Sequence, residues 1–360
     1  MARPRELLAL VLDGSREAGT PGAADARRLV ADHLRTLDYT VEERPFSFFP
    51  SSLNALPMFG AGLGWLTLIQ IPLITVAGAP AWAALAAWVV GLAALAILVR
   101  GTALGWSSLG GGVREDANLI ATRGNAPVRR WIVAHLDTKA QGQSMAGRVV
   151  GVVVAALALL TLSVLAVARL WGPLEGDMVA YAAVLALIAC GLAARGALRG
   201  TSQGARDNGS GLLAALVAAE AAPAAGVGIL ITGAEEFGLV GSRIFAREFG
   251  PQLVGVEVIN LDTIDDQGVL YVVSHDATGG RWSASVAGAL AGVAPAITER
   301  RQPLWAYVDS RPLSQTGAAA LTVARLDWGT LRRMHTPRDT PAGMAFVTAE
   351  AVGRLVAGPI

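Results

Sequence analysis

Five short polar segments, each placed after an apolar run or in a turn, hold the side chains best suited to chemistry. Their carboxylates and imidazoles are of the types that bind divalent metal ions or transfer protons. In open α/β sheets, ligands bind at the ends of strands, so these segments are expected to meet at one edge of a sheet. Within positions 131–137, 204–211, 229–242, 256–262 and 334–340, the candidate residues are His135, Asp137, Asp207, Glu235, Glu236, Asp262 and His335.

Each segment taken alone also fits a purely structural role. His135 and Asp137 fit a capped core histidine, and Asp207 with its polar neighbours fits a turn followed by a helix N-cap. Glu235 and Glu236 fit a solvated helix start, but two adjacent carboxylates at an enclosed sheet end would repel each other. In that case one of them needs a cation or a proton.

Taken together, the set combines imidazoles and carboxylates with no cysteine ligand. Such a donor set suits zinc, or a divalent ion of similar hardness, when two metals share a carboxylate. Two-metal sites activate water for hydrolysis. Because Cys190 is the single cysteine, a disulfide framework or a thiolate metal cluster within one chain is excluded.

The elements that must position these residues alternate between strand-like and helix-like patterns. Helical spacing of apolar residues spans 24–37, and an apolar helix is expected over 211–221. The alternation of these helices with apolar runs predicts an α/β sandwich with a largely buried sheet. Strands are expected at 40–46, 117–122, 131–134, 226–232, 255–261 and 269–273.

The remaining sequence is too apolar for a wholly soluble protein. Of the 360 residues, 53% are apolar and 16% are charged, and the mean hydropathy is +0.49, against about 25% charged residues in ordinary soluble domains. Four stretches without acidic or basic side chains are long enough to cross a bilayer as helices. They lie at 56–79, 81–99, 149–168 and 178–194.

We therefore expect four transmembrane helices in two hairpins, covering 56–100 and 148–196. The aqueous domain is then discontinuous and consists of 1–52, 103–147 and 198–360. Four arginines flank the spans on the side of this domain, namely Arg100, Arg148, Arg195 and Arg199. The positive-inside rule then predicts an integral membrane protein with a cytoplasmic domain. A formal charge of +1 with no basic block argues against nucleic acid as a partner.

The ordered set of polar segments resembles the M28 family of zinc metallopeptidases, many of which are aminopeptidases. The resemblance covers nearly the whole aqueous part, from the helix–strand opening at 24–48 and the segment 118–124 to the segment 335–339. It implies a three-layer sandwich with a mostly parallel, mixed central sheet. It also implies two zinc ions and a peptide substrate.

Carried over position by position, the resemblance assigns the metal ligands. His135 and Asp262 would bind one zinc ion, and Glu236 and His335 the other. Asp207 would bridge both ions, with a cis peptide bond to Asn208.

The same resemblance assigns the two catalytic carboxylates. Glu235 would be the general base that takes a proton from the metal-bound water, and Asp137 would orient the imidazole of His135. The sequence departs from the family pattern in two places. Residues 138–206, which include the second apolar hairpin, separate His135 from Asp207. A later family segment that shapes the substrate side of the pocket is represented only by 308–311.

The expected function is that of a membrane-anchored, zinc-dependent exopeptidase, an aminopeptidase, embedded in a lipid bilayer. Two alternatives stay open. One is a one-zinc acyl-transfer or cyclising relative of the same fold, and the other is a catalytically inactive membrane scaffold.

Overall fold

The computed structural model describes two compact units of the chain. The described residues are 3–50, 55–76, 78–103, 112–172, 174–195, 198–223, 225–302 and 307–360. The first unit comprises Met1–Phe48, Val113–Ala140 and Gly200–Ile360, and the second comprises Phe49–Gly112 and Gln141–Arg199. Two predicted boundaries, at 52 and 196, lie outside the described residues.

The first unit is built around an eight-stranded sheet with the order β1-β2-β4-β3-β5-β8-β6-β7. Pairings β3/β4, β3/β5, β5/β8 and β6/β7 are parallel, and the other three are antiparallel. The sheet is thus mixed, with a parallel centre. The strands are β1 (Thr40–Phe48), β2 (Arg114–Thr122), β3 (Arg130–His135), β4 (Val227–Thr232), β5 (Glu257–Ile264), β6 (Val269–Ser274), β7 (Ile297–Arg301) and β8 (Ala319–Leu326).

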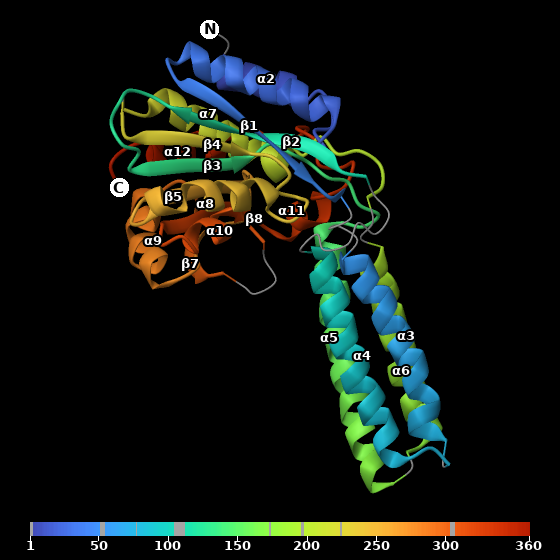
Figure 1. The fold of residues 1–360 in the computed structure, drawn as a ribbon. Coiled ribbons are helices and arrows are strands. Elements are labelled where there is room, and N and C mark those ends of the chain that lie inside the picture. The colour runs from blue at the N-terminus through green and yellow to red at the C-terminus, as the bar shows by residue number, and fades with distance from the viewer. Residues whose placement is uncertain are drawn as a thin grey trace. The chain divides into compact units, whose positions relative to one another are not determined.

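Helices cover both faces of this sheet (Figure 1). Successive side chains of a strand point to opposite faces, so Ile132 packs in one apolar cluster while Trp131 and Val133 pack in another. The cluster around Ile132 contains residues of α1, α2, α7, α9 and α12, and the opposite cluster contains residues of α8 and α10. The helical elements are α1 (Pro4–Val11), α2 (Pro21–Thr36), η3 (Ala205–Ser210), α7 (Gly211–Ala221), α8 (Val240–Leu253), α9 (Ala277–Ala289), α10 (Ser310–Ser314), α11 (Trp328–Arg333) and α12 (Val347–Val356).

The observed strands extend the predicted set. Each of the six predicted strands has a counterpart among β1 to β6, whereas β7 and β8 were not predicted. The missed β8 lies between β5 and β6, inside the sheet. Its alternation is broken by Thr322 and Arg325, both of which are buried.

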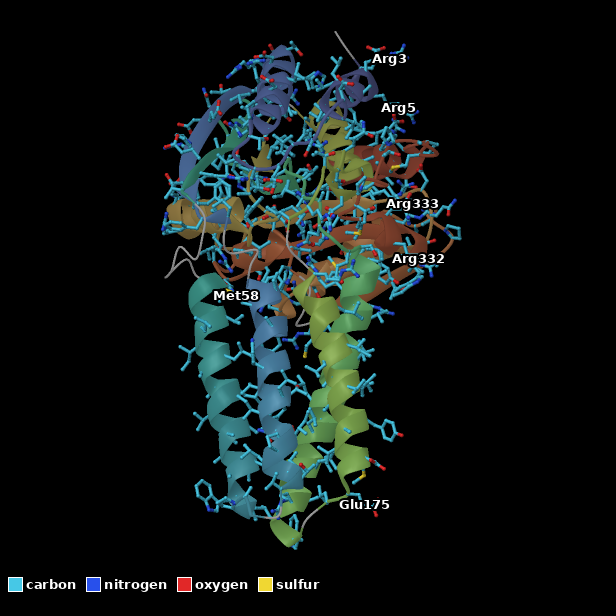
Figure 2. The ribbon with its side chains drawn as sticks, turned by 90° about the vertical axis from the view of Figure 1, so that its right-hand side faces the viewer. Arg3, Arg5, Met58, Glu175, Arg332 and Arg333 are labelled. Atoms are coloured by element: carbon cyan, nitrogen blue, oxygen red, sulfur yellow. The ribbon has the colours of Figure 1, made fainter. Side chains whose placement is uncertain are left out.

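The second unit contains four helices. They are α3 (Ala55–Thr75), α4 (Ala81–Ala103), α5 (Met145–Ala168) and α6 (Gly176–Ala194), with the short turn η2 (Arg169–Trp171) after α5. Figure 2 shows these helices side by side, with Met58 and Glu175 at opposite ends of the bundle. Three segments are long and apolar enough to cross a membrane, and they cover Pro57–Thr75, Ala81–Gly101 and Met145–Trp171.

The expectation of four spans is therefore supported for three helices. In the fourth, the apolar segment Gly176–Leu192 is shorter than the other three. A helix of that length rises about 26 Å, slightly less than a hydrocarbon core of about 30 Å.

The interior of the helical unit contains a few buried polar groups. Trp88 of α4 donates its indole N–H to Ser163 Oγ of α5 at 2.7 Å. Arg169 is buried and donates to the carbonyl oxygens of Val76 and Ala79. Many of the outward-facing side chains are large and apolar, among them Val90 and Leu160. Such a surface is typical of helices in contact with lipid.

Gln70 provides a test of this packing. Its side chain is fully buried, and within the described part of the chain neither amide atom has a hydrogen-bond partner. We predict that Gln70→Leu, which nearly conserves volume, stabilises the protein by about 1–2 kcal/mol because it removes an unpaired buried amide. Thermal unfolding of the detergent-solubilised protein measures the change. The exposed Leu68→Ala variant is the control and is expected to leave the melting temperature nearly unchanged; a lower melting temperature for Gln70→Leu would contradict the prediction.

Candidate metal centre

The predicted site residues meet at the carboxyl ends of neighbouring parallel strands. His135 is the last residue of β3, and Glu235 and Glu236 follow the end of β4. Asp262 lies near the end of β5, which also pairs with β3. The parallel register, with His135 opposite Thr232, brings these chain segments to one edge of the sheet.

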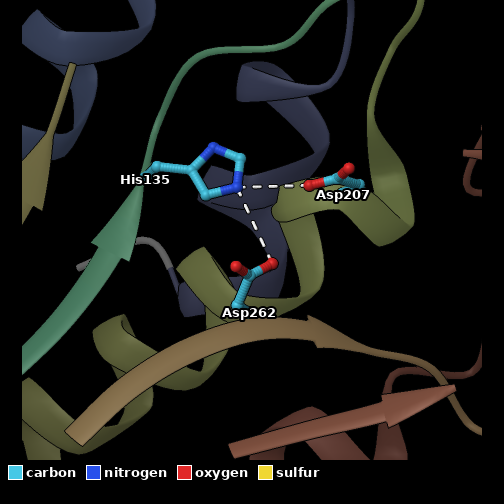
Figure 3. Close-up of side chains that lie close together, drawn as sticks. All are labelled: His135, Asp207 and Asp262. Atoms are coloured by element: carbon cyan, nitrogen blue, oxygen red, sulfur yellow. Dashed lines mark ion pairs between the residues drawn. The ribbon is translucent and has the colours of Figure 1, made fainter. Parts of the chain in front are cut away.

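One group of three side chains contains His135, Asp207 and Asp262. His135 Nε2 lies 3.2 Å from Asp207 Oδ1 and 3.8 Å from Asp262 Oδ1 (Figure 3). One donor atom from each of the three residues lies within 4.8 Å of the others. A metal ion could therefore be held by one imidazole and two carboxylates.

A second group shares Asp207 with the first. His335 Nε2 lies 2.9 Å from Asp207 Oδ2 and 3.3 Å from Glu236 Oε1. These three residues also offer donor atoms within 4.8 Å of one another. The two oxygens of Asp207 thus face different histidines, which is the arrangement expected of a bridging carboxylate.

The donor set fits a divalent metal. The five ligand candidates are all buried or nearly so, and Glu236 Oε1 is a buried oxygen without a hydrogen-bond partner among the described residues. Buried charges must be paired or coordinate metals. Carboxylate and imidazole ligands without thiolates suit zinc and related ions. The predicted role of each residue as a ligand stays a prediction.

Glu235 lies within the same enclosed group of charges. Its Oε2 is 4.0 Å from His135 Nε2. Burial raises the pKa of Glu235 well above the ordinary value; His135 opposes this shift, and the carboxylates of Glu236 and Asp309 add to it. A carboxyl group with a raised pKa is suited to accepting and returning a proton.

Asp207 shows the opposite behaviour. Burial alone would raise its pKa, but hydrogen bonds and charge from His135 and His335 outweigh burial and lower the pKa. Asp207 therefore stays ionised beside the two imidazoles, which favours cation binding.

Asp137 contacts the site differently from the predicted arrangement. His135 Nδ1 lies 3.1 Å from the backbone carbonyl oxygen of Asp137 but 3.7 Å from its carboxylate. The carboxylate instead accepts the backbone N–H groups of Glu235 and Glu236 at 3.0 and 3.1 Å. The carbonyl oxygen of Asp137 thus lies closer to the imidazole than its carboxylate does, and the carboxylate holds the Glu235–Glu236 segment in place.

The segment that carries Asp207 is fixed by Asp339. The carboxylate of Asp339 accepts the backbone N–H groups of Arg206 at 2.9 Å and Asp207 at 3.1 Å. The peptide bond between Asp207 and Asn208 is cis, as the resemblance implied. Asn208 in turn donates to the Leu261 carbonyl at 2.9 Å, next to Asp262. Hydrogen bonds thus connect the backbones that carry two of the ligand candidates.

Lys139 was not predicted as part of the site. Its ammonium group forms an ion pair with Glu236 Oε2, and both side chains are buried. Lys139 and His335 outweigh the effect of burial and lower the pKa of Glu236 to about 2. The signal was present in the sequence, because Lys139 is the only lysine among 29 basic residues.

Arg16 was also missed. Its guanidinium is almost completely buried and donates to three backbone carbonyls, those of Leu136, Gln203 and Gly204. These carbonyls belong to the segments that follow β3 and precede Asp207. Arg16 therefore joins the segment that follows His135 to the segment that precedes Asp207, although these segments lie far apart along the chain.

The segment 308–311, where the sequence departs from the family pattern, also reaches the site. Asp309 is fully buried and accepts a hydrogen bond from Thr232 at the end of β4. Burial raises the pKa of Asp309 to about 6. Asp309 therefore adds a further acidic group beside Glu235 that the sequence interpretation did not assign.

Part of the chain is similar to a known peptidase family. Residues 191–358 match the model of peptidase family M28. The match covers Asp207 and every site residue that follows it. No curated protein sequence matches the chain significantly.

Solved structures with the same fold include peptidases and cyclases. An aminopeptidase from Aneurinibacillus sp. strain AM-1 has a TM-score of 0.57 at 14% identity, with coverage of 98% of this chain and 91% of that one. The zinc aminopeptidase BSAP from Bacillus subtilis has a TM-score of 0.56 at 14% identity, with coverage of 99% and 93%. A glutaminyl cyclase from Bacteroides thetaiotaomicron, bound to N-acetylhistamine, has a TM-score of 0.58 at 14% identity, with coverage of 98% and 94%. These similarities show a shared α/β fold with a mixed central sheet.

The bonds of Arg16 lead to a stability prediction. Arg16→Met removes the donors of three backbone carbonyls, two of which are buried, so we expect a loss of about 3 kcal/mol in the free energy of unfolding. Arg5→Met is the matched control, because Arg5 forms a surface ion pair with Glu350 and its side chain is 49% exposed. Exposed ion pairs contribute about 0–1 kcal/mol. Denaturant unfolding followed by circular dichroism compares the two; equal losses would contradict the structural role of Arg16.

Proposed function

We propose that this protein is a membrane-anchored, zinc-dependent exopeptidase that acts as an aminopeptidase. The supporting observation is the pair of three-residue groups that share Asp207 and lie beside the buried Glu235. A site for two metals next to a carboxylate with a raised pKa suits the hydrolysis of peptide bonds. The M28 match supports a hydrolase, and zinc aminopeptidases among the proteins of similar fold favour zinc as the metal.

In this proposal, different residues of the chain bind the metal ions and transfer the proton. Zinc, when bound, supplies a Lewis acid that polarises the substrate carbonyl and acidifies water. His135 and Asp262 would hold one ion, Glu236 and His335 the other, and Asp207 both. Glu235 Oε2 would accept the proton of the attacking water and return it to the nitrogen of the leaving amine.

Asp137 has a positioning role in this proposal. Its carboxylate accepts the N–H groups of both Glu235 and Glu236, so it fixes the proton acceptor relative to a metal ligand. Proton transfer requires such fixed geometry, because donor and acceptor must approach within about 2.6–3.2 Å.

The central test is Glu235→Gln, which keeps the shape of the side chain but cannot accept a proton. We expect peptide hydrolysis to fall by at least about 100-fold, in line with the loss of a general base, while zinc stays bound. A peptide library with free N-termini, assayed by mass spectrometry with and without a chelator, measures hydrolysis. Elemental analysis of the same samples measures zinc. Near-normal turnover by Glu235→Gln would defeat the assignment.

The same assay distinguishes the cyclising alternative, which the glutaminyl cyclases among the proteins of similar fold favour. Hydrolysis adds one water to the substrate across the cleaved bond. Cyclisation of an N-terminal glutamine instead forms a ring by attack of the amine on the side-chain amide and releases ammonia. A peptide with N-terminal glutamine that loses ammonia without cleavage would identify a cyclase. No conversion of any peptide by the zinc-loaded protein would favour the scaffold alternative.

We further propose that the helical unit spans the bilayer four times and leaves the peptidase unit in the cytoplasm. Three helices have the required length and apolar composition, and the fourth is a shorter apolar helix. The basic residues Arg100, Arg148, Arg195 and Arg199 lie on the side expected to face the cytoplasm. A peptidase in this orientation would act on cytoplasmic peptides.

Cysteine labelling tests this orientation, because Cys190 can be replaced to give a cysteine-free chain. In the Cys190→Ala background, a membrane-impermeant maleimide should label Glu175→Cys in intact cells. It should label the control variant Arg5→Cys only after the cells are permeabilised. The reverse pattern would contradict the orientation, and labelling of both variants in intact cells would contradict the four spans.

A further inference from the structure

We propose that Lys139 makes the two metal sites unequal. One dication binds tightly to His135, Asp207 and Asp262, and a second binds more weakly to Asp207, Glu236 and His335. This inference rests on the metal centre of the proposed function. It concerns how many ions the protein holds when zinc is scarce.

The contact that carries the inference lies within the second group of ligands. Lys139 forms an ion pair with Glu236 Oε2, and Glu236 belongs to the second group only. No ion pair between Lys139 and Asp207 or Asp262 is found in the described part of the chain. A cation that binds through Glu236 therefore meets a fixed positive charge that a cation in the first group does not touch.

Because this ion pair is buried, the charge of Lys139 acts strongly on a metal ion that binds through Glu236. Lys139 is 7% exposed and Glu236 is 6% exposed, so water screens their charges only weakly. Lysine is almost never fully buried unless it is paired. The ammonium group thus neutralises one ligand carboxylate before any metal arrives, and it repels a metal ion at that position.

Charge balance favours a single tightly bound ion. The ligand carboxylates are those of Asp207, Glu236 and Asp262, which together carry three negative charges when ionised. Lys139 and one dication neutralise these three charges. A second dication would add positive charge that these three carboxylates no longer balance, in a site withheld from water.

The choice of lysine leaves the second site usable. A lysine ammonium is a compact point charge, whereas an arginine guanidinium takes both oxygens of a carboxylate. Glu236 Oε1 accordingly remains without a hydrogen-bond partner among the described residues and lies 3.3 Å from His335 Nε2. All the other basic residues of this chain are arginine, so lysine occurs solely at this position.

Zinc binding to the full-length, detergent-solubilised protein tests the inference. The protein is stripped with a chelator and equilibrated at buffered free zinc concentrations, and bound zinc is counted by elemental analysis. For the unmodified protein, we expect the second equivalent to require at least tenfold more free zinc than the first. For Lys139→Met, the second equivalent should bind at tenfold or more lower free zinc, with the first equivalent little changed.

Further variants identify the sites and control for charge. Lys139→Arg keeps the positive charge, and because a guanidinium takes both oxygens of a carboxylate it should weaken the second equivalent further and leave the first little changed. Asp262→Asn should weaken the tight equivalent, and His335→Ala the weak one. Melting temperatures of the metal-free variants check folding, and Lys139→Gln replaces Lys139→Met if the latter does not fold.

Three results would overturn the inference. They are equal affinities for both equivalents in the unmodified protein, an unchanged separation in Lys139→Met, and loss of the tight equivalent in His335→Ala. These measurements do not depend on turnover. A protein that binds zinc unequally but cleaves no peptide would refute the proposed function and leave this inference intact, whereas two equal sites in an active peptidase would do the reverse.

Discussion

The crowding of like charges in a buried space is the constraint on which the rest of this structure depends. Asp207, Glu235, Glu236 and Asp262 approach two imidazoles at one edge of the sheet, and each is largely withheld from water. Carboxylates so close together cannot all ionise without cations or protons. The surrounding structure is arranged to supply both, through the histidines, Lys139 and the raised pKa of Glu235.

Backbone hydrogen bonds keep this crowded group in place. Asp137 holds the chain after β4, and Asp339 holds the chain around Asp207. Both are acidic residues whose side chains accept N–H groups and so remain paired. His335 itself has a φ of +62°, a conformation that residues other than glycine rarely adopt. Such conformations persist where neighbouring contacts determine them and cluster at functional sites.

Much of this arrangement could be predicted from the sequence. Apolar runs that end in His135 or shortly before Glu235 indicated strands whose polar ends meet, and the structure places the predicted ligands within a few ångströms of one another. The position of each polar segment after a strand was enough to predict that the ligand candidates meet, because parallel neighbouring strands bring their carboxyl ends to the same edge of the sheet. Apolar length indicated the four helices of the second unit in the same direct way, and three of them are long and apolar enough to cross a membrane.

Other features depend on contacts that a linear pattern does not record. Strand β8 was missed because Thr322 and Arg325 place one polar side chain on each of its faces. Their partners Ser310 and Thr348 lie on other elements. The ion pair of Lys139 with Glu236 joins positions 97 residues apart. Sequence spacing does not determine whether the carboxylate of Asp137 points to the imidazole of His135 or to the backbone N–H groups of Glu235 and Glu236.

The insertion of helices α5 and α6 between His135 and Asp207 has a consequence for biosynthesis. Because a chain is made from its N-terminus, all four apolar helices are complete before Asp207, Glu236 and His335 have been synthesised. If the protein is anchored in a membrane as proposed, the nascent chain can enter the bilayer while it still lacks most of the ligand candidates. Any hydrolytic activity would then arise only once the C-terminal strands close the sheet, after insertion of the helices.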